Sequence, residues 1–151
     1  IKHGAKFIQA VTNCTVPKIT IIVGGSYGAG NYAMAGRGMA PRFLFAWPRS
    51  VVSVMGPAQA GSVLRQVAET KVLRSGGELN EETTEAIHSM EQETISDMEA
   101  RSNALANTAR VWDDGLIDPA DTRAVIAFVL GVCREGDERA VNTSTFGIGR
   151  L

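Results

Sequence analysis

One stretch of this sequence constrains its fold more than any other. An expected strand runs directly into a glycine-rich turn, and a helix of small residues follows. Residues 19–38 read ITIIVGGSYGAGNYAMAGRG. Residues 19–23 are mostly β-branched aliphatics, which predicts a buried strand. Residues 24–30 are expected to form a loop, and the small residues within 31–38 predict a helix that packs closely against a neighbour. This order of elements is typical of an α/β fold.

The rest of the chain predicts a small mixed sheet flanked by helices. We expect further strands at residues 43–47 and 51–55, and helices at residues 2–13, 58–70, 81–101 and 119–134. The helix from residue 81 is polar with sparse apolar positions, and it either ends near residue 101 or continues to residue 110. It is expected to cover a surface or reach a partner. The helix at 119–134 is apolar on most sides and is expected to be deeply packed. With 151 residues, the chain is expected to form a single α/β domain, 1–151.

The glycine loop matches the dinucleotide-binding pattern G-x-G-x-x-A at Gly28, Gly30 and Ala33. That fingerprint also needs an acidic residue about 20 positions further on, to bind the ribose hydroxyls. Ser50 stands there, and no Asp or Glu precedes Glu69. No Gly-Lys-Ser/Thr follows the loop either, so the sequence disfavours both classes of nucleotide site.

The same loop also fits the nucleophile elbow of hydrolases, as Gly24-x-Ser26-x-Gly28. A serine nucleophile needs a histidine base positioned by an acid. The only later histidine, His88, falls in the expected polar helix, which is a poor position for that base. The sequence therefore disfavours a serine hydrolase.

Two interpretations of the loop then stay open. A glycine turn that opens a helix leaves backbone N–H groups free to form an oxyanion hole. Alternatively, the glycines only pack a helix against a strand. Charge favours a negative ligand, because residues 1–68 hold seven lysines and arginines but no acid. The basic residues are equally expected if the acidic half folds over them.

Metal, membrane and nucleic-acid sites are not expected. Cys14 and Cys133 stand in apolar surroundings and are expected to be small buried hydrophobes. No cluster of residues has the spacing of metal ligands. The longest apolar stretch is far shorter than the roughly 20 residues that span a bilayer.

Three segments resemble the carboxyltransferase β subunits of biotin-dependent acyl-CoA carboxylases, and most of all the methylcrotonoyl-CoA group of that family. They are residues 16–56, VPKITIIVGGSYGAGNYAMAGRGMAPRFLFAWPRSVVSVMG, residues 109–126, ARVWDDGLIDPADTRAVI, and residues 146–151, FGIGRL. The resemblance implies a crotonase-like fold of the ClpP/crotonase superfamily. The chain would be the carboxyltransferase C-terminal domain, incomplete at its N-terminal side, with an exposed sheet edge.

In this family the N-terminal domain binds acyl-CoA and the C-terminal domain binds carboxybiotin. The resemblance therefore implies that backbone N–H groups of Ala29 and Gly30 hold the biotin ureido oxygen, with Tyr27 and Gly28 beside it. Released CO2 would then carboxylate 3-methylcrotonoyl-CoA to 3-methylglutaconyl-CoA, a step of leucine degradation. Departures from the family pattern at residues 39–40, 56–59 and 103–107 leave other enzymes open. These enzymes are the geranyl-, propionyl- and acetyl-CoA carboxylases and a biotin-dependent decarboxylase. The alternative without enzymatic activity is a crotonase-like module that serves only in assembly.

The family also implies partners and a location. A biotin carboxylase and biotin carrier α subunit would use the ATP, and the β subunits would form a hexamer. The protein would be cytoplasmic in a bacterium and in the mitochondrial matrix of a eukaryote, and this fragment alone is expected to be inactive.

Other residues have two interpretations each. Tyr27 and Tyr32 either wall the biotin pocket or belong to the core. Arg37, Arg42 and Arg49 either meet CoA phosphates or a partner, or are solvated. Trp112, Asp113 and Asp114 match the family segment, although capping and packing explain them as well.

Overall fold

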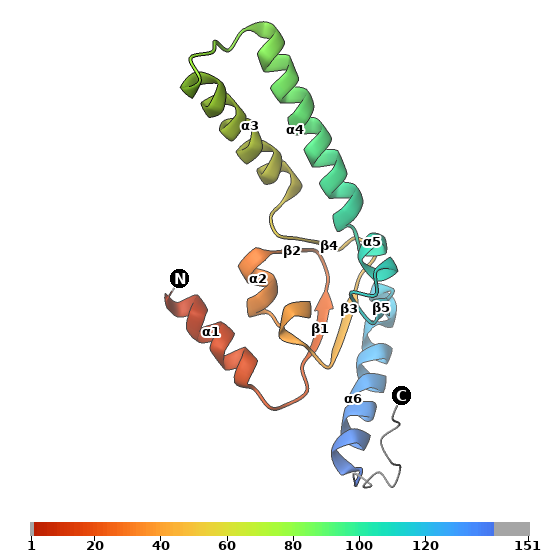
Figure 1. The fold of residues 1–151 in the computed structure, drawn as a ribbon. Helices are drawn as coiled ribbons and strands as arrows, with labels where there is room; N and C mark the ends of the chain where they lie inside the picture. The colour runs from red at the N-terminus through yellow and green to blue at the C-terminus, as the bar shows by residue number, and fades with distance from the viewer. Residues whose placement is uncertain (1, 141–151) are drawn as a thin grey trace, which may run out of the picture.

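Two small parallel sheets form the centre of the molecule, with helices around them (Figure 1). The computed structural model describes residues 2–140. Residues 146–151, one of the three segments that carry the family resemblance, lie outside the described residues. The sheets are parallel rather than mixed, because each connection between paired strands crosses over the sheet instead of forming a hairpin.

The first sheet holds the apolar core. It contains β1 (Ile19–Ile22), β3 (Phe43–Ala46) and β5 (Gly115–Leu116), in the order β1-β3-β5. Ile22 pairs with Ala46, and these residues form the buried cluster with Leu44. β1 and β5 are the edge strands of this sheet.

The second sheet pairs β2 (Gly25–Tyr27) with β4 (Val51–Ser53). The sequence predicted a loop where β2 lies, because a short, glycine-containing strand carries no apolar alternation. α2 (Gly28–Ala33) follows β2 at once and is shifted towards the N-terminus relative to the predicted helix at 31–38. It ends early because Ala35 takes a left-handed conformation with φ of 54°, and a 3-10 turn, η1 (Arg37–Met39), follows.

A long helical hairpin projects from the sheets (Figure 1). It consists of α3 (Pro57–Arg74) and α4 (Glu81–Ser102), each close to its predicted extent. The side chain of Asn80 caps α4 by accepting a hydrogen bond from the Thr83 N–H, as expected for an N-cap. The second helix does not continue to residue 110, because the extended Asn103 ends it and caps a separate helix, α5 (Ala104–Ala109).

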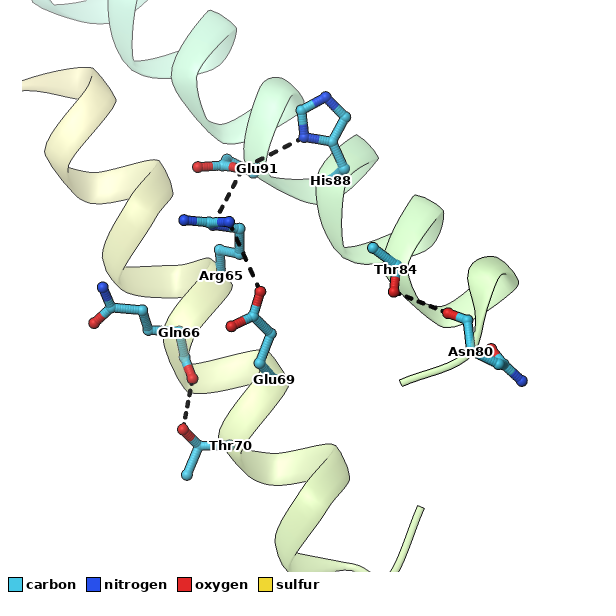
Figure 2. Close-up of polar contacts among 8 residues, drawn as sticks. All are labelled: Arg65, Gln66, Glu69, Thr70, Asn80, Thr84, His88 and Glu91. Carbon is cyan, nitrogen blue, oxygen red and sulfur yellow. Dashed lines mark hydrogen bonds and ion pairs between the residues drawn. The ribbon is translucent and has the colours of Figure 1, made fainter. Parts of the chain in front are cut away.

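Close packing and ion pairs join the two helices of the hairpin. Gly61 is buried where α3 meets Ile95 of α4. Figure 2 shows Arg65 of α3 between two carboxylates, 3.6 Å from Glu91 on α4 and 3.9 Å from Glu69 on its own helix. Glu91 also lies 3.5 Å from His88 (Figure 2). The polar helix thus contributes a real interface, and its main partner is the neighbouring helix α3, with further contacts to β4.

The remaining helices are mostly exposed. α1 (Lys2–Asn13) buries no residue. Cys14 beside it is exposed, so the expected burial of Cys14 is wrong. A 3-10 turn, η2 (Pro119–Asp121), leads into α6 (Thr122–Glu138). Expected deep packing of this last helix is also wrong: Val129 and Cys133 are buried, but Phe128 is 72% exposed and Leu130 54%. The described residues supply a partner for only one face of this apolar helix.

Candidate functional site

The candidate site lies where the strand β2 gives way to the helix α2. Ligands of open parallel sheets bind beyond the carboxyl ends of the strands. β2 ends at Tyr27 and α2 starts at Gly28, so the loop glycines stand at such an end. β2 pairs with β4 up to Tyr27, which fixes the backbone immediately before the site.

The first turn of α2 presents backbone donors. Ala29 and Gly30 are the second and third residues of α2 and are both exposed. The first N–H groups of a helix have no acceptor within it. Tyr27, the N-cap residue, makes no side-chain capping bond, so no cap within the described residues takes up these donors. The arrangement can donate hydrogen bonds to a negatively charged oxygen.

The two glycines of this turn have different roles. Gly28 has φ of 48°, and a Cβ there would lie 2.9 Å from the Val54 carbonyl oxygen. Gly28 therefore shapes the turn, since a side chain would be strained in that conformation. A Cβ at Gly30 would meet nothing within 4 Å. Gly30 therefore faces open space.

Side-chain hydrogen bonds anchor α2 at both ends. Asn31 Nδ2 donates to Ser26 Oγ over 2.9 Å, which ties the helix back to β2. Thr20 Oγ1 of β1 donates to the Ala35 carbonyl over 2.9 Å just after the helix. Sequence reasoning missed both Asn31 and Thr20. An Asn five residues after a Ser across a tight loop is the signal that points to the first of these bonds.

Ser26 is not placed as a hydrolytic nucleophile. Its hydroxyl accepts from Asn31, and no histidine is among its hydrogen-bond partners in the described part of the chain. His88 lies on the hairpin and pairs with Glu91 (Figure 2). The structure thus agrees with the sequence in disfavouring a serine hydrolase.

Both tyrosines near the turn are at the surface. Tyr27 is 40% exposed and Tyr32 is 49% exposed, so the alternative that places them in the core is wrong. Their rings lie over glycines: a Cβ at Gly25 would lie 2.7 Å from the Tyr27 ring, and a Cβ at Gly38 would lie 2.8 Å from that of Tyr32. Both residues are therefore open to solvent.

Two open cavities adjoin α2. One, of about 260 Å³, is lined by the end of β1, by Gly24, Gly25 and Ser26, and by Asn31 and Met34. The other, of about 430 Å³, lies between α1, β1 and α2. Thr20 and Met34 line both cavities.

The segment around Trp112 has a structural role. The Arg37 guanidinium lies 4.5 Å from the Trp112 ring centre, and Arg110 lies 5.3 Å from it. Both carboxylate oxygens of Asp113 accept from Thr108 Oγ1, at 2.7 and 2.9 Å. These contacts favour the packing interpretation of this segment.

The remaining arginines and possible metal ligands add nothing to the site. Arg42 lies 5.4 Å from the ring centre of its neighbour Phe43, and Arg49 is exposed. Within residues 2–140 no three His, Cys, Asp or Glu side chains gather as metal ligands would. In the same part of the chain, no helix has both the length and the apolar character to cross a membrane.

Comparison with known proteins gives a consistent result. Residues 1–144 match the family described as carboxyl transferase domain. The chain is 43% identical over 150 residues to the probable mitochondrial methylcrotonoyl-CoA carboxylase beta chain of Drosophila melanogaster, covering 99% of this chain and 25% of that protein. The chain therefore spans about a quarter of the length of this relative.

Solved structures agree with the expected crotonase-like carboxyltransferase fold. The β subunit of geranyl-CoA carboxylase from P. aeruginosa superimposes with a TM-score of 0.83 at 49% identity, over 100% of this chain and 27% of that one. The transcarboxylase 12S subunit, described as a hexamer assembly, has a TM-score of 0.69 at 30% identity, over 97% of this chain and 26% of that one. The fold expected from the sequence is confirmed.

Proposed function

The chain belongs to the carboxyl transferase domain family, and on that premise we propose that it is the biotin-binding part of an acyl-CoA carboxylase β subunit. The whole protein would transfer a carboxyl group from carboxybiotin to 3-methylcrotonoyl-CoA. One observation carries the proposal: the first turn of α2 presents uncapped N–H groups at Ala29 and Gly30, and Gly30 leaves open space beside them.

The residues fit a biotin ureido oxygen. Negative charge develops on that oxygen when a carboxyl group leaves the ring, and two backbone donors stabilise such charge. Gly30 leaves room for a flat ring to approach the backbone, while Tyr27 and Gly28 form the adjoining surface. Bound carboxybiotin supplies the carboxyl group and the base. This chain then needs no acid or base of its own, which suits the acid-free stretch of residues 1–68.

The donors contribute through their position. Backbone N–H groups do not titrate, so they remain hydrogen-bond donors in every protonation state of the site. Asn31, directly after Gly30, brings a neutral amide rather than a carboxylate to the turn. A negative side chain there would oppose the charge that Ala29 and Gly30 are proposed to stabilise.

A second acyl-CoA deserves equal testing. Similarity to the geranyl-CoA carboxylase β subunit is high over the entire chain, which favours a longer branched acyl group as the alternative substrate. Both substrates use the same chemistry at the candidate site, so residues outside this chain would decide between them.

The proposed partners follow from the same relatives. An α subunit with biotin carboxylase and carrier domains would consume ATP and deliver carboxybiotin. We propose a hexamer of β subunits, in line with the hexamer described for the transcarboxylase 12S subunit. The location would be the mitochondrial matrix in a eukaryote, since the fly relative is named as mitochondrial, or the cytoplasm in a bacterium.

Reconstitution tests this function directly. The full-length β subunit that contains this chain is combined with its α subunit, ATP and labelled bicarbonate, and offered 3-methylcrotonoyl-, geranyl- or propionyl-CoA. Incorporation that depends on biotin and is greatest with 3-methylcrotonoyl-CoA is the expected result. Greater incorporation with geranyl-CoA would identify geranyl-CoA, instead of 3-methylcrotonoyl-CoA, as the substrate. An assembled complex that carboxylates none of them would refute catalysis and favour a non-catalytic assembly module.

A further inference from the structure

The short helix α2 depends on contacts outside itself for its orientation. It has six residues, and so short a helix is not stable on its own. Its capping residue, Tyr27, provides no side-chain bond at the N-terminus. The direction in which Ala29 and Gly30 present their N–H groups is therefore set by whatever holds the helix in place.

One side chain connects α2 to the strand before it. Asn31 Nδ2 donates to Ser26 Oγ over 2.9 Å, and both residues are partly buried. Within residues 2–140 this is the only side-chain hydrogen bond that a residue of α2 makes. Ser26 is held by the pairing of β2 with β4, opposite Val52. The bond thus fixes α2 against a paired strand rather than against a free loop.

Gly36 fixes the conformation of Asn31 from the other side. The Gly36 N–H donates to the Asn31 carbonyl over 2.7 Å. A Cβ at Gly36 would lie 2.6 Å from that carbonyl oxygen and would overlap the side-chain amide. Gly36 is buried and Asn31 is partly buried, so this close approach lies largely inside the protein. The Asn31 side chain fits only because position 36 has no side chain.

We propose that Asn31 is a positioning residue, whose bond to Ser26 aims the N–H groups of Ala29 and Gly30 at the ligand oxygen. The inference rests on the proposed function for its kinetic consequence. Asn31 follows Gly30 directly, so a rotation of the helix about its Asn31 anchor would turn both donors. Loss of the bond should therefore slow the chemical step and leave acyl-CoA binding, which lies outside this chain in the proposal, unchanged.

Kinetics of the reconstituted full-length complex test this role. Asn31→Ala and Ser26→Ala should each lower kcat about tenfold, the upper range for one neutral hydrogen bond. The KM for acyl-CoA should stay the same. Because both residues act through one bond, kcat of the double variant should fall no further than kcat of the more impaired single variant. Ser26→Thr keeps a hydroxyl and should restore most of the rate.

The matched control is Asn13→Ala. Asn13 Nδ2 donates to the Gln9 carbonyl over 2.8 Å on α1, an exposed bond of the same type away from α2. This variant should keep the wild-type kcat. Rates within twofold of wild type for both Asn31→Ala and Ser26→Ala, or fully additive losses in the double variant, would overturn the positioning role.

Hydrogen exchange separates this inference from the proposed function. The Met34 N–H donates to the Gly30 carbonyl, so peptides that cover residues 28–36 report whether α2 is intact. Faster exchange in Asn31→Ala than in Asn13→Ala supports the anchor whatever the enzyme catalyses. Unchanged exchange overturns it even if the wild-type complex carboxylates acyl-CoA. A wild-type complex that carboxylates nothing refutes the proposed function without altering the exchange result.

Discussion

Leu44 and Asp114, 70 residues apart in the chain, exchange two hydrogen bonds. The Leu44 N–H donates to Asp114 Oδ2 over 2.7 Å, and the Asp114 N–H donates to the Leu44 carbonyl over 2.7 Å. Leu44 belongs to the buried cluster, so its N–H is shielded from water. The Asp114 carboxylate therefore extends the β3–β5 pairing beyond the two residues of β5.

Asp114→Ala should destabilise the protein by about 1–3 kcal/mol, because it leaves the buried Leu44 N–H without an acceptor. Asp114→Asn keeps an oxygen acceptor without the charge, so this variant should lose less stability than Asp114→Ala. Urea unfolding of the full-length protein measures both changes.

Asp137→Ala is the control for this test, because Asp137 is exposed in the last turn of α6 and no hydrogen bond or ion pair of it is seen in the described residues. It should change the free energy of unfolding by no more than about 0.5 kcal/mol. An Asp114→Ala protein as stable as this control would show that the carboxylate contributes nothing to strand pairing.

Alanine should lower the stability of the protein at one helix glycine, Gly61, and raise it at another, Gly131. A Cβ at Gly61 would lie 2.7 Å from Ile95 Cγ1 and 2.9 Å from its Cδ1. Gly61→Ala should therefore cost about 1–3 kcal/mol through overpacking of the hairpin. A Cβ at Gly131 meets nothing within 4 Å on α6, so Gly131→Ala should stabilise by up to about 1 kcal/mol through helix propensity. Thermal unfolding of the two variants compares them directly.

Ile95→Ala provides the rescue. It removes both atoms that a Cβ at position 61 would strike, so the Gly61→Ala/Ile95→Ala protein should be more stable than the sum of the single losses predicts. Strictly additive losses would mean that α3 and α4 shift to accommodate the alanine, and that Gly61 does not set their separation.

Arg37 should contribute to stability through Trp112 rather than to substrate binding. Its guanidinium lies 4.5 Å from the ring centre at a partly exposed site, where such contacts are worth about 0.5–1 kcal/mol. A double-mutant cycle of Arg37→Ala and Trp112→Ala should give a coupling of that size. The KM of the reconstituted complex for acyl-CoA should not change in Arg37→Ala; a large rise would restore the alternative in which Arg37 meets CoA phosphates.

The sequence predicts those parts of the fold whose cause is local. The β-branched run at 19–22, the apolar run at 43–46 and the Asn80 cap all lie where their own side chains place them. β2 was missed because its pairing with β4 holds it in place and its own residues do not. The Asn31–Ser26 bond was missed for a similar reason, since it exists only once α2 starts at Gly28.

The apolar helix α6 shows the opposite error. Its composition predicts burial, and Phe128 and Leu130 are nevertheless exposed. The apolar composition of a helix indicates that its surface needs to be covered. It does not indicate which part of the protein covers it. Since the chain spans about a quarter of a curated relative, burial inferred from composition alone assumes neighbours that these residues do not contain.

Gly30→Val should abolish carboxyl transfer in the reconstituted complex and leave acyl-CoA binding in place. A Cβ at Gly30 meets nothing within 4 Å, so the fold around it has room for a side chain. The valine methyl groups would instead occupy the open space from which a flat ring is proposed to reach the Ala29 and Gly30 donors. Transfer from carboxybiotin, acyl-CoA affinity and the unfolding midpoint are the three measurements.

Gly28→Ala provides the contrast that separates chemistry from folding at this turn. Gly28 has φ of 48°, and a Cβ there would lie 2.9 Å from the Val54 carbonyl oxygen. Alanine should therefore cost about 1 kcal/mol or more in stability, with activity falling as the turn is distorted. Gly30→Val should keep the wild-type unfolding midpoint because its backbone is unstrained. If it kept normal turnover as well, the oxygen would not be bound at Ala29 and Gly30, and the donors would have to be sought elsewhere in the subunit.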